Sequence, residues 1–179
     1  PDIQVHFIPY RVVLKDGKRT LGKEPGITCT VNQNRPESKG SIHIKSNNPE
    51  EYPSIKYNFL SNSLDRDTLV AGVKLIRNIM QSEPMKEFCS DEIQPGMDFS
   101  SDANILQFIR DKAETVYHPS GTCKMGFDEN AVVDKELKVH GIKGLRIADA
   151  SIMPTLISGN TNAACMMIGE RCADFIMHS

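Results

Sequence analysis

The stretch NSLDRDTLVAGVKLIRNIM, residues 62–80, decides the fold because the sequence changes there from a strand pattern to a helix pattern. Its apolar residues recur at spacings of four, three and four, on one face of a helix: Leu69, Val73, Ile76 and Met80. Asn62 with Asp65 three residues later has the form of a capping box, which predicts that the helix begins there. We therefore expect a long helix that lies across a sheet.

The residues before this stretch alternate between apolar and polar side chains, as strands with one buried face do. The alternation occurs in residues 3–7, 28–31 and 42–44. Asp16 followed by Gly17 is typical of a hairpin turn, and residues 36–40 favour another turn. Short connections of this kind predict an antiparallel sheet with one face exposed to water.

Two further helices are expected after residue 80. Ser82 followed by Pro84 indicates a new helical turn, and Ser101 begins a helix. The apolar positions of that second helix are Ile105, Phe108, Ile109 and Val116.

The last third of the chain combines short strand patterns with one helical pattern. Residues 132–133, 137–139 and 145–148 predict short strands, and residues 161–176 predict a helix rich in small residues and methionine. Strands and helices are segregated along the chain rather than alternating, so the predicted fold class is α+β: an antiparallel sheet with helices on one face, followed by a C-terminal strand and helix segment.

Composition excludes several classes of protein. With 39% hydrophobic and 25% charged residues among 179, the chain can bury a core, and its net charge of −2 without a charged block argues against nucleic-acid binding. The longest apolar runs, such as residues 163–168, are far shorter than the roughly 20 residues of a spanning helix. Five cysteines without a CxxC pair argue against a disulfide framework or a zinc site and predict a cytoplasmic protein. Peripheral attachment to the inner membrane stays open, because it needs no spanning helix.

The stretch VYHPSGTCKMG, residues 116–126, contains the best candidate for a catalytic side chain. Pro119 biases His118 away from helical geometry, which presents the imidazole rigidly, as proton abstraction requires. The alternative is that His118 only forms a hydrogen bond within a loop. A thiol enzyme using Cys123 with His118 is a weaker alternative, since no third orienting residue can be assigned, and hydrolysis is weak without a GxSxG motif.

A second informative stretch combines LRIADASIMP, residues 145–154, with SGNTNAA, residues 158–164. A strand followed by a glycine-containing helix start leaves backbone N–H groups at the positive end of a helix, where an anion or an electron-rich ring is stabilised. The alternative is ordinary N-capping of the helix by Asn160 or Thr161.

Together these stretches resemble the C-terminal region of the glucose-methanol-choline (GMC) family of FAD-dependent alcohol oxidoreductases. The resemblance runs in order through residues 1–7, 38–46, 118–119, 148–151 and 159–162. Three further stretches are most similar to the members that oxidise choline: residues 113–119, 122–126 and 168–170. The expected donor is therefore choline, with another primary alcohol as the alternative.

The resemblance implies specific roles for six residues. His118 is the expected base, which takes the alcohol proton while hydride passes to flavin N5, and Asn160 is its partner at the substrate oxygen. Asp149 and Ala150 correspond to positions that line the diphosphate and ribityl chain of FAD. The backbone at Thr161 and Asn162 corresponds to positions that face the pyrimidine end of the flavin, where a helix dipole favours negative charge.

The chain contains no GxGxxG motif for a dinucleotide and begins with Pro1, so we expect a piece of a longer flavoprotein. Residues 1–131 are assigned to a substrate-binding domain and residues 132–179 to a segment returning to the FAD-binding domain. The missing partner is the N-terminal FAD-binding part, without which we expect neither tight FAD binding nor turnover. A non-catalytic α+β binding module is the alternative from another class.

Overall fold

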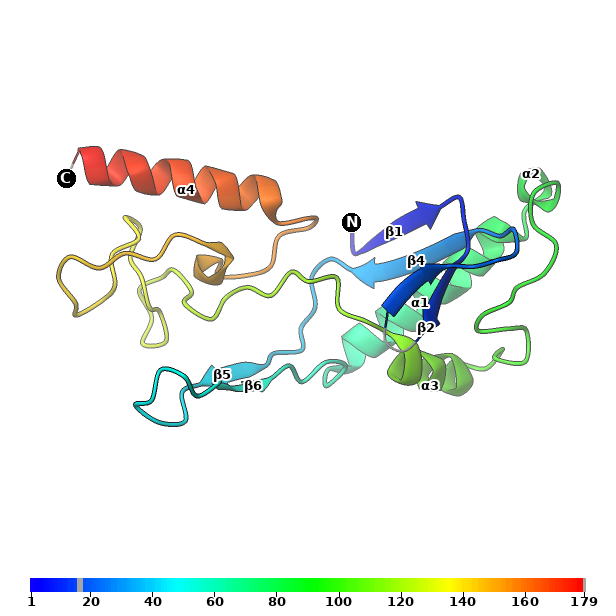
Figure 1. Ribbon diagram of the computed structural model, residues 1–179, viewed down its shortest axis with the longest axis horizontal. Helices are drawn as coiled ribbons and strands as arrows, with labels where there is room; N and C mark the ends of the chain where they lie inside the picture. The colour runs from blue at the N-terminus through cyan, green and yellow to red at the C-terminus, as the bar shows by residue number, and fades with distance from the viewer. Residues whose placement is uncertain (16–17, 179) are drawn as a thin grey trace. The chain divides into compact units, whose positions relative to one another are not determined.

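The computed structural model describes residues 1–15 and 18–178 (Figure 1). The chain divides into two compact units, each built from two separate segments. Unit 1 contains Pro1–Gln33 and Asn62–Glu114, and unit 2 contains Asn34–Ser61 and Thr115–Ser179. The chain therefore passes from one unit to the other three times.

The strands of unit 1 form two antiparallel pairs. β1 (Ile3–Ile8) pairs with β4 (Thr28–Gln33), in a register that places Phe7 opposite Cys29. This pairing confirms the strands predicted at residues 3–7 and 28–31.

The second pair of unit 1 joins β2 (Val12–Lys15) to β3 (Lys18–Leu21). The hairpin turn predicted at Asp16 and Gly17 lies outside the described residues. Thr28 connects the two pairs, because its hydroxyl accepts the N–H of Val12 at 2.8 Å and donates to the carbonyl of Tyr10 at 3.0 Å.

Helix α1 (Ser63–Met80) packs against β4, as Figure 1 shows, and this confirms the helix predicted from residues 62–80. Asn62 caps it, with Oδ1 accepting the N–H of Leu64 at 2.9 Å. The predicted apolar stripe is half-buried, whereas Val70 and Gly72 are buried. At about 100° per residue, Val70 and Gly72 flank the predicted stripe on either side, and Gly72 is the one that approaches Val31 of β4.

Two shorter helices complete unit 1. α2 (Glu83–Lys86) follows Ser82 as predicted, and α3 (Asp102–Lys112) buries Ile105 and Ile109. The extension of α3 to Val116 was wrong, because the helix ends at Lys112 and the next residue is extended, with ψ 144°.

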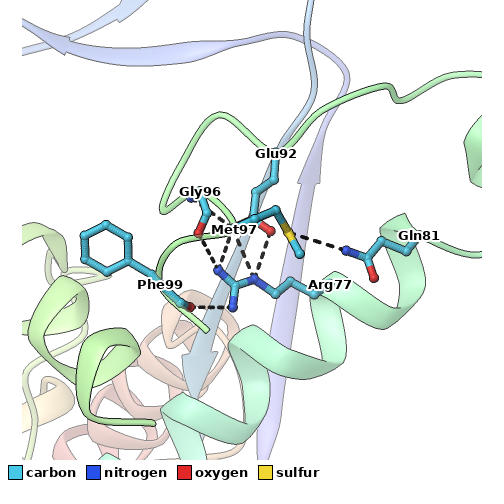
Figure 2. Close-up of polar contacts among 6 residues, drawn as sticks. All are labelled: Arg77, Gln81, Glu92, Gly96, Met97 and Phe99. Carbon is cyan, nitrogen blue, oxygen red and sulfur yellow. Dashed lines mark hydrogen bonds and ion pairs between the residues drawn. The ribbon is translucent and has the colours of Figure 1, made fainter. Parts of the chain in front are cut away.

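The connection between α2 and α3 is fastened to α1 by one arginine (Figure 2). The Arg77 guanidinium donates to both carboxylate oxygens of Glu92, at 2.8 and 3.1 Å from Nε. It also donates to the carbonyls of Gly96 and Phe99, at 3.0 and 2.7 Å. The side chains of Arg77 and Glu92 are only 13% and 19% exposed, so the ion pair of this Arg77 cluster is well shielded from water.

Unit 2 begins with a small antiparallel ribbon. β5 (Ser41–His43) pairs with β6 (Ser54–Lys56), with Ile42 opposite Ile55. The predicted sheet is thus divided, within the described ranges, into three separate two-stranded ribbons. The third ribbon, β5 with β6, belongs to unit 2, and an alternation pattern alone cannot reveal which strands pair with one another.

The core of unit 2 forms where α4 (Asn162–Met177) packs on irregular chain. This helix confirms the one predicted over residues 161–176. The buried core residues are Val133, Leu137, Ile152, Met153, Ile168 and Cys172.

The strands predicted between residues 132 and 148 appear only as isolated bridges, such as Val133 with Val139 and Lys138 with Arg146. Leu137 at φ 65° and the glycines at 141 and 144 at φ 76° and 77° turn the chain too often for a ladder to extend. The α+β class is nevertheless confirmed. Among the helices in the described part of the chain, none combines the length and apolar character needed to cross a bilayer.

Candidate active site

His118 lies in unit 2, in the segment that follows a sharp reversal of the chain. Tyr117 adopts φ 62°, a left-handed conformation that is uncommon for a residue other than glycine. The reversal is supported locally, since the N–H of Tyr117 donates to Thr115 Oγ1 at 3.1 Å. Pro119 then restricts the backbone of His118 from the other side. The imidazole is therefore presented by a constrained loop, which begins after α3 ends at Lys112.

The His118 ring is held by Thr161, 43 residues later in the chain. Nδ1 of His118 lies 3.1 Å from Oγ1 of Thr161. Thr161 is 9% exposed and His118 is half-buried, so the contact is shielded from bulk water. In the part of the chain that the structure describes, this is the only hydrogen bond of the ring.

Thr161 stands at the N-cap position of α4 without capping it. Its φ and ψ of −83° and −12° are helical, and its side chain makes no capping hydrogen bond. The caps of α1 and α3, Asn62 and Ser101, are extended and do accept a helix N–H. The alternative prediction that the Thr161 side chain caps α4 was therefore wrong. From this side chain the helix lacks a capping contact worth about 1 kcal/mol. The start of α4 keeps its backbone N–H groups unshielded by that side chain, with the hydroxyl turned to His118.

The segment after His118 runs beside the short 3-10 helix η1 (Ala150–Ile152). The N–H of Cys123 donates to the Ser151 carbonyl at 2.9 Å, and the N–H of Met125 donates to the Ile152 carbonyl at 2.7 Å. These bonds connect the His118 loop to the chain that contains Asp149 and Ala150, the predicted cofactor residues.

Asp149 itself caps η1, with Oδ1 accepting the N–H of Ser151 at 2.7 Å. Its side chain belongs to an exposed residue, whereas Ala150 is half-buried. The carboxylate therefore has a local structural role at the position that the resemblance assigns to FAD.

Asn160 and Asn162, the remaining predicted site residues, flank Thr161 and are both exposed. The loop before them is fastened by Arg35, whose Nε donates to Ser158 Oγ at 2.7 Å. Within the described ranges, no hydrogen bond joins His118 to Asp149, Ala150 or Asn162.

The geometry thus brings His118 together with Thr161, one of the predicted site residues. Sequence reasoning missed the side-chain role of Thr161 and the link from Arg35. For Thr161 the signal was available: a polar residue at a predicted helix start, adjacent to the expected partner of the base.

The arrangement offers a proton acceptor beside the positive end of a 16-residue helix. One ring nitrogen of His118 is occupied, and the other can accept a proton from a bound hydroxyl group. Cys123 is half-buried and makes no hydrogen bond with His118 in the described chain, so nothing here supports a thiol enzyme. No cluster of three or more metal-ligating side chains occurs in the described residues.

Comparison with known proteins identifies one family. The family described as GMC oxidoreductase matches residues 36–169. The chain is 43% identical over 176 residues to the oxygen-dependent choline dehydrogenase of Escherichia coli O45:K1 (strain S88 / ExPEC) and 44% identical to that of Klebsiella pneumoniae. Each alignment covers 98% of this chain and 31% of the relative, so the chain spans about a third of the curated relatives' length.

Solved structures agree with these matches. Pyridoxine 4-oxidase from Mesorbium loti has a TM-score of 0.88 and 28% identity, covering 100% of this chain and 35% of the other. Formate oxidase from Aspergillus oryzae has a TM-score of 0.80 and 32% identity, covering 88% and 28%.

Proposed function

The chain belongs to the GMC oxidoreductase family, and from that membership we propose that it is the C-terminal catalytic portion of an FAD-dependent choline dehydrogenase. The proposed reaction oxidises choline to betaine aldehyde. Its support is the 43% identity to an enzyme of that name over 98% of the chain. Because the chain spans only 31% of that relative, we further propose that an N-terminal FAD-binding part completes the enzyme.

The division by role that we propose differs from the division into compact units. Residues 1–131 form the substrate-binding part, and residues 132–179 complete the FAD-binding domain. That boundary falls inside unit 2, next to the core residue Val133. Unit 2 would then contain both the base and the segment that approaches the cofactor.

The residues at the start of α4 fit a large electron-rich group. A Cβ atom built on Gly159 would meet no atom within 4 Å, so the space beside Gly159, shortly before α4, is open. The helix dipole and the N–H groups that Thr161 does not cap favour negative charge there. We assign the backbone of Thr161 and Asn162 to the flavin ring, and Asp149 and Ala150 to the diphosphate and ribityl chain.

In the proposed reaction, Nε2 of His118 accepts the hydroxyl proton of the alcohol. FAD, when bound, supplies the hydride acceptor at N5, so the alcohol loses one proton and one hydride and becomes an aldehyde. Asn160 holds the substrate oxygen through its amide without competing for the proton. The shielded contact of His118 with Thr161 is the single observation that most supports this use of the imidazole.

The test is anaerobic reduction of the flavin in the full-length protein by a panel of alcohols that includes choline. We expect choline to bleach the flavin fastest; faster bleaching by another primary alcohol would reassign the donor. Absence of bleaching by every alcohol would favour the binding module.

Variants of His118 test the assignment of the base. His118→Ala should slow flavin reduction at least 100-fold with flavin content near normal, as loss of a general base does. His140→Ala is the matched control, because this exposed histidine of unit 2 makes a side-chain hydrogen bond to a backbone carbonyl, that of Gly126, at 3.1 Å. An unchanged rate in His118→Ala would remove His118 from the mechanism.

A further inference from the structure

We propose that Thr161 is a positioning residue that selects the reactive tautomer of His118. Its hydroxyl oxygen accepts a hydrogen bond from the N–H of Nδ1 and leaves the lone pair of Nε2 directed to the substrate. This inference rests on the function proposed above, and it gives the Thr161 side chain a role distinct from that of its backbone at the flavin.

The argument begins with the two nitrogens of a neutral imidazole. One carries a proton and donates, and the other has a lone pair and accepts. Nδ1 lies 3.1 Å from the Thr161 hydroxyl, which can either donate or accept. Only when Thr161 accepts is Nε2 free of a proton. A base that acts through Nε2 therefore requires the hydroxyl to be the acceptor.

Thr161 is itself well fixed, which makes it a suitable anchor for the ring. It is 9% exposed, and its carbonyl accepts the N–H of Cys165 at 2.9 Å in the first turn of α4. The same helix buries Ile168 and Cys172 in the core of unit 2. The imidazole is thereby attached to a packed helix, although His118 itself lies in a loop.

The local conformation of Thr161 points to the same role. Asn62 and Ser101 show that the other two long helices are capped by a side chain. At the start of α4 the Thr161 hydroxyl is hydrogen-bonded to His118 instead, and the backbone of Thr161 is helical.

The experiment uses the full-length holoenzyme and measures the rate of anaerobic flavin reduction together with the dissociation constant of the alcohol. Thr161→Val removes the hydroxyl and keeps the shape, and Thr161→Ser keeps the hydroxyl. We expect about 10-fold slower reduction in Thr161→Val, unchanged flavin content, little change in alcohol affinity, and recovery in Thr161→Ser. The matched control is Thr155→Val, at an exposed threonine of unit 2, which should leave the rate unchanged.

A double variant separates positioning from a general structural effect. If Thr161 acts through His118, Thr161→Val should cause no further loss in a His118→Ala background. Losses that multiply in the double variant would overturn the proposal, as would an unchanged rate in Thr161→Val. Failure of the wild-type enzyme to be reduced by any alcohol would instead contradict the proposed function.

A spectroscopic measurement on the wild-type holoenzyme decides the tautomer even when Thr161→Val loses its flavin. Histidine ring nitrogens are labelled with ¹⁵N, and the His118 signals are identified by their absence in His118→Ala. With the ring neutral, we expect a protonated Nδ1 and an unprotonated Nε2. A protonated Nε2 would overturn the proposal whatever the rate measurements show.

Discussion

Gly72 of α1 lies so close to β4 that a Cβ atom on it would stand 2.8 Å from Cγ2 of Val31. At a distance this short, the Val31 side chain or one of the two elements must shift. Glycine at this helical position thus permits the helix to approach the strand, at the cost of the helix propensity that alanine would provide.

Replacement of Gly72 by Ala should therefore destabilise the full-length protein, by about 1–3 kcal/mol, as overpacking does. In a Val31→Ala background the clash is removed, and the same replacement should stabilise by up to about 1 kcal/mol through helix propensity. Denaturant unfolding of the four proteins measures both effects. The same sign in both backgrounds would contradict the packing argument.

Because the Arg77 side chain makes several contacts at once, replacing it should strongly reduce the free energy of unfolding (Figure 2). Arg77→Ala leaves Glu92 and the carbonyls of Gly96 and Phe99 without their shared donor, so we expect a loss of about 2–4 kcal/mol in unfolding free energy. Arg77→Lys should recover only part of it, since an ammonium cannot form the two-pronged contact.

The control for this prediction is Lys86→Ala, which breaks the exposed pair with Glu83. A pair whose side chains are 59% and 85% exposed should contribute at most about 0.5 kcal/mol. Equal effects of Arg77→Ala and Lys86→Ala on the thermal unfolding midpoint would show that the cluster has no special role.

The lowered pKa of Asp134 leads us to expect that stability depends on pH. Partial burial raises the pKa of its carboxyl, but hydrogen bonds from the N–H groups of Lys138 and Glu136, at 2.9 and 2.8 Å, outweigh this and hold the pKa below its ordinary value. A pKa that is lower in the folded state gives stability above the unfolded pKa of about 3.9, and that stability is lost as the pH falls through the folded pKa.

Asp134→Asn keeps an oxygen acceptor and removes the charge. Its thermal unfolding midpoint should lie below that of the wild-type protein at pH 7, and the two should converge as the pH falls below about 4. Asp67→Asn, at an exposed carboxylate of α1, serves as the control. A difference that stays constant or grows on acidification would refute the assignment.

Asp149 allows the structural and cofactor roles of one carboxylate to be separated. Asp149→Asn retains an oxygen that can cap η1 by accepting the N–H of Ser151, whereas Asp149→Ala removes the cap. If capping is the main role, flavin content of the full-length protein should fall in Asp149→Ala and stay near normal in Asp149→Asn. Equal loss of flavin in both variants would indicate that the charge itself is required.

The features of the fold that sequence patterns predicted correctly are those that interactions between neighbouring residues determine. The α1 helix follows from Asn62 and a helical apolar period, and the family resemblance, which rests on ordered stretches of sequence, is confirmed by the match over residues 36–169. The extension of α3 to Val116 was wrong, because the helix ends at Lys112 and the chain beyond it is extended. Glu114 pairs with Arg19 at 2.7 Å, 95 residues away in the chain, and no local pattern contains that information.

The same distinction applies to the candidate site. His118 is recognisable from its proline neighbour and its motif, but its partnership with Thr161 depends on how two segments of unit 2 fold together. From the sequence and the resemblance, Thr161 was expected either to cap the helix or to contact the flavin through its backbone. The assignments of Asn160, Asp149, Ala150 and Asn162 to substrate and flavin stay predictions, and the Asp149 variants described above test one of them.

The interleaving of the two units has a consequence for synthesis on the ribosome. Residues 34–61 are translated well before residues 115–178, with which they form unit 2. At about 5–20 residues per second, the nascent chain waits on the order of ten seconds between the emergence of Arg35 and that of Ser158, its hydrogen-bond partner. During that interval the ribbon of β5 and β6 has no packed unit to join, so a chaperone that shelters nascent chains would have its greatest effect there.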